Sequence, residues 1–313
     1  MDYTVLGRTG LRVSRMGLGG GGHSRLGLSY GKTDADAEQI VKEALHLGVN
    51  FIDTAESYQT EEVIGRALKS TPRDQVVIST KAGVEWQDRR CTADELRERV
   101  TGSLTRLQTD YVDVFHLHGV SADDYPYAVQ ELLPTLRDLQ TEGKVRFLGI
   151  TEQFIIDPTH KTLTLALAND YWDVIMVGFS ILNPSARERV FPKTQQKGIG
   201  TLGMFAVRRA LSQSEALGEL MEELVTQNLV ERSAFDAANP LGFLLENGVA
   251  ESIPEAGYRF VRWEPGMDVT LISTGNLDHL RENVVSFGKP ALPDAVSERL
   301  RNLFGRVDNV SGN

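Results

Sequence analysis

The chain has 313 residues, of which 41% are hydrophobic and 24% are charged, and its formal net charge is −10. This is the composition of an ordinary globular protein, and its acidic balance argues against nucleic acid and anionic membranes as partners. The single cysteine, Cys91, excludes an internal disulfide, and the chain shows neither a signal peptide nor an apolar run near the roughly 20 residues that span a bilayer, so we expect a cytoplasmic protein.

The first element predicted along the chain is a short β-hairpin, in which residues 3–6 and 11–13 flank the turn Gly7-Arg8-Thr9-Gly10. Strand and helix candidates then alternate, and most of the strands are apolar on both faces, as parallel strands covered by helices are. The alternation predicts an α/β fold, a (β/α)8 TIM barrel with an N-terminal β-hairpin, in a single domain over residues 1–313. The strand candidates are residues 13–18, 49–53, 76–81, 111–117, 144–150, 173–179, 198–204 and 268–274.

Helix start signals support the same alternation. Thr92 and Glu95 form a capping box that opens a helix running to about Leu107, and Thr33 precedes another helix with two aspartates in its first turn. Further helices are predicted at 217–229, inside the long stretch 208–266, and at 294–304.

A glycine-rich segment, Gly17-Leu18-Gly19-Gly20-Gly21-Gly22, satisfies the pattern G-x-G-x-x-G after a strand. A Rossmann fingerprint requires its last glycine to open a helix and an acidic residue about 20 positions further on. Here residues 23–32 have the character of a loop, and Asp53 follows about 31 positions after Gly22. The glycines therefore indicate a backbone that comes close to another group at the barrel rim.

Four polar side chains follow three successive strand candidates: Asp53, Tyr58, Lys81 and His118. In a barrel of this kind, chemistry occurs at the carboxyl ends of the strands. Each residue alone would more often be structural, but their joint position on adjacent strands predicts an active site. The ammonium of Lys81 is expected to lower the pKa of the Tyr58 phenol, Asp53 to hold that ammonium, and His118 to orient the reacting oxygen. This set contains no obvious nucleophile and no metal-ligand spacing, so it suits hydride exchange with a cofactor.

The segments that carry these residues make the chain resemble an aldo-keto reductase over nearly its whole length. The matching segments are residues 6–14, the stretch Asn50–Tyr58, the lysine strand 78–81 and the histidine strand 107–118. The resemblance implies a barrel that binds NADPH or NADH in an extended form, with Tyr58 as general acid/base and His118, rather than His116, as the catalytic imidazole.

The resemblance also implies the cofactor contacts, several of which depart from the family pattern. Thr151-Glu152 replaces a Ser-Asn pair that holds the carboxamide, and Glu152 would accept from its NH2 group and favour the oxidised cofactor. Met176 and Met204 replace a glutamine and a ring-stacking tyrosine, and Arg208 and Arg209 would reach the pyrophosphate. Ser273 and His279 stand where lysine and arginine often bind the 2′-phosphate, so NADP is expected as the family default, with NAD or dual use close behind. The full set of implied cofactor-binding residues is Gly19, Gly20, Thr151, Glu152, Met176, Met204, Arg208, Ser273, Thr274, Gly275, Asn276, His279, Glu282 and Asn283.

The substrate is expected to be a small carbonyl compound or alcohol, with Trp86, Tyr125 and Phe154 as pocket walls. We thus predict an NAD(P)-dependent oxidoreductase that reduces an aldehyde or ketone, or oxidises the matching alcohol or sugar. Two alternatives stay open: a cofactor-binding regulatory subunit that senses redox state with little turnover, and a Schiff-base lyase that uses Lys81 as nucleophile. The sequence does not predict the oligomeric state.

Overall fold

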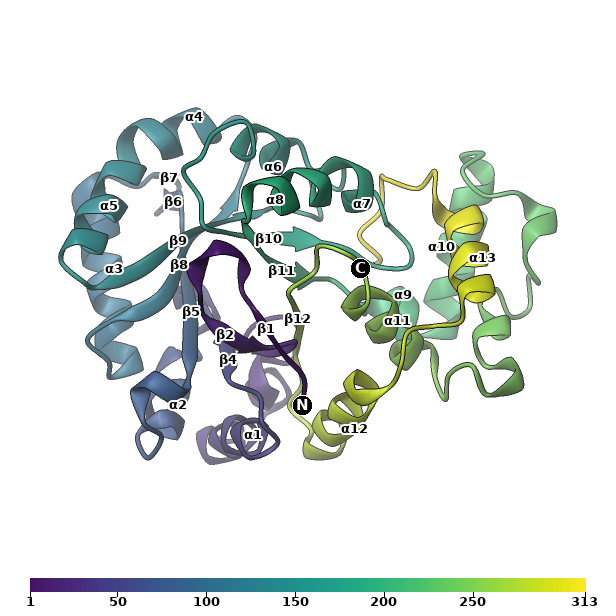
Figure 1. The fold of residues 1–313 in the computed structure, drawn as a ribbon, viewed down its shortest axis with the longest axis horizontal. Helices are drawn as coiled ribbons and strands as arrows, with labels where there is room; N and C mark the ends of the chain where they lie inside the picture. The colour runs from purple at the N-terminus through teal and green to yellow at the C-terminus, as the bar shows by residue number, and fades with distance from the viewer.

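The computed structural model describes residues 1–313, and the chain begins with the predicted hairpin. Strands β1 (Tyr3–Val5) and β2 (Arg12–Ser14) pair antiparallel, with the 3-10 turn η1 (Gly7–Thr9) between them. Gly7 has φ +46°, and a Cβ there would lie 2.2 Å from the amide nitrogen of Gly200, so the turn packs against a barrel strand at a distance that only glycine permits. The hairpin thereby covers the amino-terminal end of the barrel, and in Figure 1 it lies in purple across the strands.

Eight parallel strands close the predicted barrel in the order β10-β11-β12-β3-β4-β5-β8-β9. Each coincides with a predicted strand to within a few residues at its ends. The first prediction, 13–18, was wrong in one respect, because it joined the end of β2 to β3 across Arg15. The strands are β3 (Met16–Gly19), β4 (Phe51–Asp53), β5 (Val77–Gly83), β8 (Val112–Val120), β9 (Val145–Glu152), β10 (Val174–Gly178), β11 (Gly200–Met204) and β12 (Val269–Ile272).

Helices surround the barrel. Two of them begin at the predicted start signals, Thr92 with its predicted capping box and Thr33, which also forms a capping box, with Asp36. The predicted helix 217–229 begins three residues earlier, at Ser214, and lies with the final helix at the right-hand side of Figure 1. A minor two-stranded sheet, β6 (Glu85–Trp86) with β7 (Arg89–Arg90), follows β5. The helices are α1 (Asp34–His46), α2 (Glu61–Leu68), α3 (Ala93–Leu107), α4 (Tyr125–Tyr127), α5 (Leu133–Thr141), α6 (Lys161–Ala166), α7 (Ala186–Arg189), α8 (Phe191–Lys197), α9 (Arg209–Ser212), α10 (Ser214–Thr226), α11 (Ile253–Arg262), α12 (Leu277–Gly288) and α13 (Asp294–Phe304). None of them is both long and apolar enough to cross a membrane.

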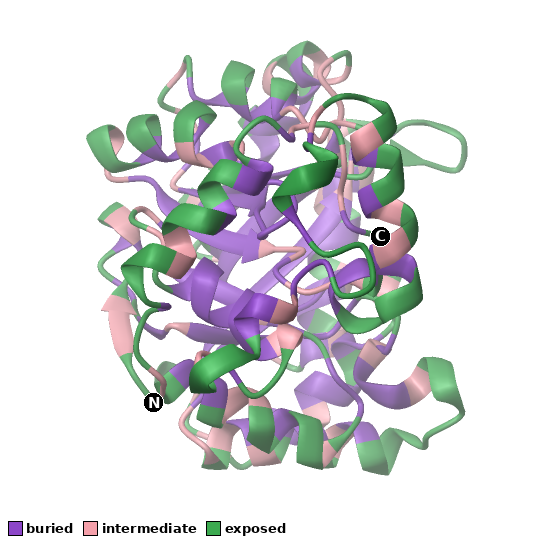
Figure 2. Cartoon of the chain, turned by 90° about the vertical axis from the view of Figure 1, so that its right-hand side faces the viewer, coloured by how far each residue is buried: buried purple, intermediate pink, exposed green.

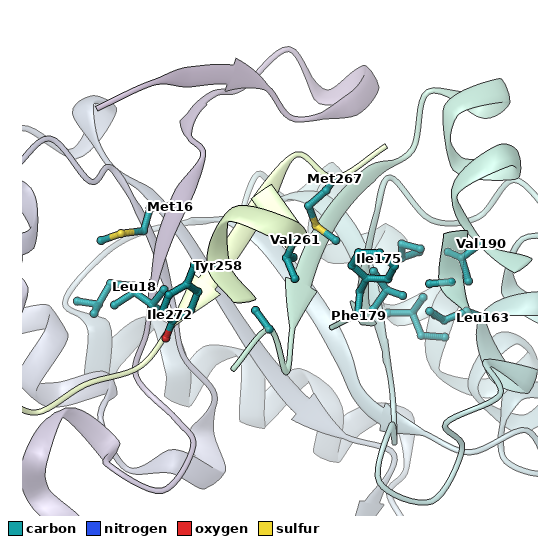
Figure 3. Close-up of a cluster of buried hydrophobic side chains, with 14 of the residues drawn as sticks. Met16, Leu18, Leu163, Ile175, Phe179, Val190, Tyr258, Val261, Met267 and Ile272 are labelled. Carbon is teal, nitrogen blue, oxygen red and sulfur yellow. The ribbon is translucent and has the colours of Figure 1, made fainter. Parts of the chain in front are cut away.

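The apolar core has two layers. The larger lies between the strands and the helices, and Figure 3 shows part of it, with Met16, Leu18 and Ile272 from neighbouring strands. The smaller fills the barrel interior and includes Leu6 and Leu11 of the hairpin segment. Figure 2 shows the result, buried strands at the centre and exposed helix faces outside.

Strand alternation decides which side chains enter the interior. In β8, Phe115 and Leu117 belong to the outer layer and Val114 to the inner one, so His116 and His118 point inward. The side chains that point into the barrel are therefore apolar in its lower part and polar near the carboxyl ends of the strands.

Candidate active site

The structure brings Asp53, Tyr58, Lys81 and His118 together at the carboxyl end of the barrel. The ammonium of Lys81 donates to Asp53 Oδ2 and to the carbonyl of Thr54, both at 2.6 Å. Tyr58 Oη lies 3.2 Å from His118 Nε2, and Lys81 Nζ lies 5.0 Å from the centroid of the Tyr58 ring. A buried ion pair therefore lies beneath a phenol whose hydroxyl meets an imidazole.

The position of Tyr58 depends on the turn η3 (Glu56–Tyr58), which ends at Gln59 in the left-handed region with φ +58°. Arg25 Nε donates to the carbonyl of Tyr58 at 2.7 Å and fixes the end of this turn. A Cβ at Gly21 would lie 2.4 Å from the Tyr58 ring, so one role of the glycine-rich segment is to leave room for the phenol. Gly19, Gly21 and Gly22 line the cavity above the ring, whereas Gly20 does not. A Cβ at Gly20 would lie 2.7 Å from Thr60 Oγ1, on the other face of the segment, and its predicted cofactor contact stays a prediction.

Arg99 of α3 links η3, the turn that carries Tyr58, to β5, the strand that carries Lys81. Its Nε donates to Glu56 Oε1 at 2.7 Å and its Nη1 to the carbonyl of Gly83, at the end of β5, at 2.8 Å. Arg99 and Glu56 are both largely buried, so this ion pair is protected from solvent. No sequence motif indicated this contact.

Burial dominates the electrostatics of the site. It lowers the pKa of His118 to about 3, and the positive charges of Lys81 and Arg99 act in the same direction, so His118 is neutral at physiological pH. Burial raises the pKa of Tyr58 above its ordinary value, although Lys81 opposes that shift. The expectation of a lowered phenol pKa was therefore wrong for the protein alone, because the cost of burying a phenolate exceeds the stabilisation from the ammonium. Burial likewise raises the pKa of Asp53, against the pull of Lys81.

A cavity of about 940 Å³ opens above these residues. Tyr58 and His118 lie at its base with Met176 and Met204, and it extends to Ser273 at the end of β12. Its volume is at the upper end of the range typical of small-molecule sites. It is therefore large enough for a reactive ring and a substrate side by side.

Thr151 and Glu152 at the end of β9 face opposite ways, as alternation requires. Thr151 faces the cavity, and its hydroxyl accepts the backbone N–H of Gly119 at 2.6 Å. Glu152 Oε1 instead accepts from His160 Nδ1 at 2.9 Å and from the Gly178 backbone N–H at 2.8 Å, and its side chain is fully buried. Glu152 borders the cavity, but its carboxylate lies on the outer face of the strand and is already bound there, so this geometry gives no support to the predicted carboxamide contact.

Phe205 also lines the cavity, although it was not among the predicted site residues. It follows β11 directly and has φ +66°, a conformation that non-glycine residues rarely adopt. Its ring meets the ring of Phe154 edge-on at 5.3 Å and lies under the guanidinium of Arg208 at 4.3 Å. An aromatic residue directly after a barrel strand was the available signal, but the family pattern directed attention to the neighbouring Met204.

Of the three predicted pocket walls, only Phe154 lines the cavity. Trp86 packs under the guanidinium of Arg99 at 4.5 Å, beside the Gly83 end of β5. Tyr125 is buried, and its hydroxyl accepts from Trp172 Nε1 at 3.3 Å. Neither Trp86 nor Tyr125 lines this cavity, and whether either contacts a bound substrate stays a prediction.

The far end of the cavity suits a diphosphate. Arg208 is half-buried and has no carboxylate partner; its guanidinium donates only to Asn313 Oδ1, at 2.7 and 3.1 Å. A Cβ at Gly22 would come within 3.8 Å of Arg208 Nη1 and 3.5 Å of Ser273 Oγ, so the absence of a side chain there leaves a small cradle beside the cation. Burial lowers the pKa of Arg208, and an anion would relieve that cost. Arg209, by contrast, is exposed and lies 3.9 Å from Glu219.

Apart from Ser273, which lines the cavity, the residues predicted for the adenosine end lie beyond it, on the loop after β12 and the first turns of α12. Asn276 Oδ1 caps α12 by accepting the backbone N–H groups of Asp278 at 2.8 Å and His279 at 3.4 Å. Thr274 Oγ1 accepts the Asn276 N–H at 3.1 Å, and Gly275 packs so closely on Gly27 that a Cβ would lie 2.3 Å away. The remaining predicted residues, His279, Glu282 and Asn283, follow on α12 and are exposed or half-buried.

Comparisons with known proteins agree with this architecture. The model of the aldo/keto reductase family matches residues 15–303. L-galactose dehydrogenase from Arabidopsis thaliana is 38% identical over 157 residues, 48% of this chain and 48% of that protein, so the match spans about half of that enzyme. Aldo-keto reductase YhdN from Bacillus subtilis strain 168 is 28% identical over 306 residues, 90% of this chain and 88% of that one. The holo form of aldo-keto reductase AKR11C1 from Bacillus halodurans aligns with a TM-score of 0.72 and 24% identity over 97% of this chain and 96% of that chain, a likeness of fold.

Proposed function

This chain belongs to the aldo/keto reductase family, and from that premise we propose that it is a cytoplasmic NAD(P)-dependent oxidoreductase that reduces an aldehyde or ketone with Tyr58 as proton donor. The observation that carries the proposal is the phenol at the cavity base, 3.2 Å from the neutral imidazole of His118 and above the Lys81–Asp53 ion pair. This arrangement supports the proposal because a phenol, a neutral imidazole and an ammonium lie close together, and these groups could serve as acid, orienting group and fixed positive charge.

The residues present fit the cofactor at two places. Arg208 and the glycine cradle at Gly22 would hold the diphosphate, and Thr151, Met176 and Phe205 would surround the nicotinamide ring. When bound, this ring supplies the hydride.

The four polar residues then govern the proton. With its pKa raised by burial, Tyr58 keeps its proton at neutral pH and can give it to the oxygen of a reduced carbonyl. Lys81 stabilises the phenolate that remains, and Asp53 holds the ammonium in place. His118, being neutral, can donate one hydrogen bond to the substrate oxygen and so orient it. In the opposite direction, the phenolate would accept the proton of an alcohol, which favours oxidation at higher pH.

The apolar lining near the base favours a substrate of mixed character. Phe154 and the exposed side chains of Ile155 and Ile156 form one wall of the cavity, and Gln153 adds an amide. A small aldehyde, a ketone or a sugar can be accommodated by such a lining. Because one relative is named for L-galactose, this sugar belongs among the first compounds to be tested.

The geometry does not favour the lyase alternative. A Schiff base requires a neutral, accessible amine, whereas Lys81 is fully buried and bonded to a carboxylate at 2.6 Å. A regulatory subunit would hold the cofactor in the same site, so only measured turnover separates that alternative from a reductase.

The experiment is a turnover assay with NADH and NADPH over a panel of aldehydes, ketones and sugars, using the wild type, Tyr58→Phe and Tyr30→Phe. Tyr30 lines the same cavity but is exposed and makes no contact with the ion pair, so its variant is the matched control. We expect turnover in the wild type and in Tyr30→Phe, and its near-complete loss in Tyr58→Phe with cofactor affinity retained. Tight cofactor binding without turnover on any compound would favour the regulatory subunit instead.

A further inference from the structure

The start of α12 carries several charges, but its cations are already engaged. Arg281 Nε lies 2.8 Å from Glu43 Oε1, and its Nη1 lies 3.2 Å from Asp278 Oδ1. Lys32 Nζ donates to the carbonyl of Gly275 at 2.6 Å and so fastens the loop 24–32 to the loop after β12. Each of the two cations therefore has a structural partner.

The start of α12 also carries two exposed carboxylates, Asp278 and Glu282. The side chain of Asp278 is 79% exposed, and Glu282 one turn later is also exposed. The helix amino terminus offers little to an anion either, because Asn276 Oδ1 takes the N–H groups of Asp278 and His279. A dianion here would meet two carboxylates, and the one cation of this helix turn, Arg281, is already paired with Glu43 and Asp278.

The two ends of the nucleotide site therefore differ in character. At the diphosphate end, Arg208 is a half-buried cation without a carboxylate partner. At the adenosine end, Arg281 is neutralised by Glu43 and Asp278, and a carboxylate such as Asp278 is a suitable acceptor for a ribose hydroxyl. We infer that this chain binds the form of the cofactor with a free 2′-hydroxyl, NADH or NAD+, in preference to the 2′-phosphorylated form. The inference rests on the proposed function, and it departs from the NADP expected from the family resemblance.

The test is a fluorescence titration of the purified protein with NADH and with NADPH at low ionic strength, which reads binding without turnover. We expect NADH to bind at least about tenfold more tightly, a difference equivalent to about 1.4 kcal/mol. Raising the salt concentration should narrow the gap, because screening weakens the repulsion between the 2′-phosphate and exposed carboxylates.

Two variants probe the adenosine end directly. Glu43→Gln releases one partner of Arg281, and His279→Arg adds a cation on the first turn of α12; each should improve NADPH binding relative to NADH severalfold. Glu38→Gln is the matched control, since Glu38 lies on the same helix, α1, but pairs with Arg66 and Lys42. It should leave the ratio of the two affinities unchanged.

The outcomes separate the two proposals. Binding of NADPH as tight as or tighter than that of NADH would overturn the inference and leave the proposed function intact. An affinity ratio that neither Glu43→Gln nor His279→Arg changes would overturn the assignment of the site to α12. Binding of neither cofactor would overturn the proposed function and the inference with it.

Discussion

Replacing Lys81 with methionine is expected to destabilise the barrel as well as to abolish turnover. Methionine fills a similar volume, but it leaves the Asp53 carboxylate with Ser79 Oγ, at 2.8 Å, as its one remaining side-chain partner. The side chains of Lys81 and Asp53 are 0% and 4% exposed, so water cannot replace the ammonium.

The size of the effect follows from this burial. Removing one partner of a buried ion pair costs about 3–5 kcal/mol, because the other charge stays behind without compensation. At about 2 °C for each kcal/mol in a domain of this size, the midpoint of thermal unfolding should fall by about 6–10 °C. In the variant, burial raises the pKa of Asp53 without an ammonium to oppose it, so the folded state binds the proton more tightly than the unfolded state does. The stability of Lys81→Met should therefore fall as the pH rises, and its deficit should be smaller at pH 5 than at pH 8.

The assay is thermal unfolding at both pH values for Lys81→Met, Asp53→Asn, the double variant and Lys42→Met. Lys42 is a matched lysine on α1 whose side chain is 47% exposed and whose pair with Glu38, at 3.4 Å, is worth less than about 1 kcal/mol. The double variant should lose less than the sum of its single variants, because it removes both charges. A Lys81→Met protein as stable as Lys42→Met, or strictly additive single effects, would refute this reasoning.

Three further predictions concern the surroundings of the site. Arg99→Met should lower kcat about 10- to 100-fold with cofactor affinity unchanged, because the tyrosine turn loses its tie to the lysine strand; an unchanged kcat in steady-state assays would contradict this. The rate of carbonyl reduction should show no histidine titration between pH 5 and 8, since the pKa of His118 is about 3; an inflection there that His118→Gln removes would show that the imidazole is charged. Gly149→Ala should lower the free energy of unfolding by about 1–3 kcal/mol, because its Cβ would lie 2.1 Å from His116 Nδ1. Gly218→Ala in α10, where no atom lies within 4 Å of the added Cβ, should not lower it. Equal effects of the two substitutions would contradict the tight packing inferred around Gly149.

The sequence predicted most of the fold because strand alternation and helix caps are local signals. Asp53, Lys81 and His118 could be placed together since parallel neighbours in a barrel end at the same rim. The capping box at Thr92 and the start signal at Thr33 located two helix starts. These predictions needed no knowledge of distant contacts.

The errors have a different physical origin. Glu152 borders the cavity as expected, but strand alternation in β9 directs its carboxylate outward, to His160 on the next loop. Tyr125 is held by Trp172, which is 47 residues away in sequence, and no local pattern reveals such packing. The left-handed backbone of Phe205 and the raised pKa of Tyr58 likewise depend on the assembled site.

The most direct test of the central claim is the fate of a labelled hydride, measured by mass spectrometry of the product formed with cofactor deuterated at the transferable C4 position. For the best substrate of the panel, the wild type should place one deuterium on the carbinol carbon. Tyr58→Phe should bind the cofactor equally well but form the labelled product about 10²–10⁴-fold more slowly. A product without deuterium, or undiminished label transfer in Tyr58→Phe, would contradict hydride transfer with Tyr58 as the proton donor.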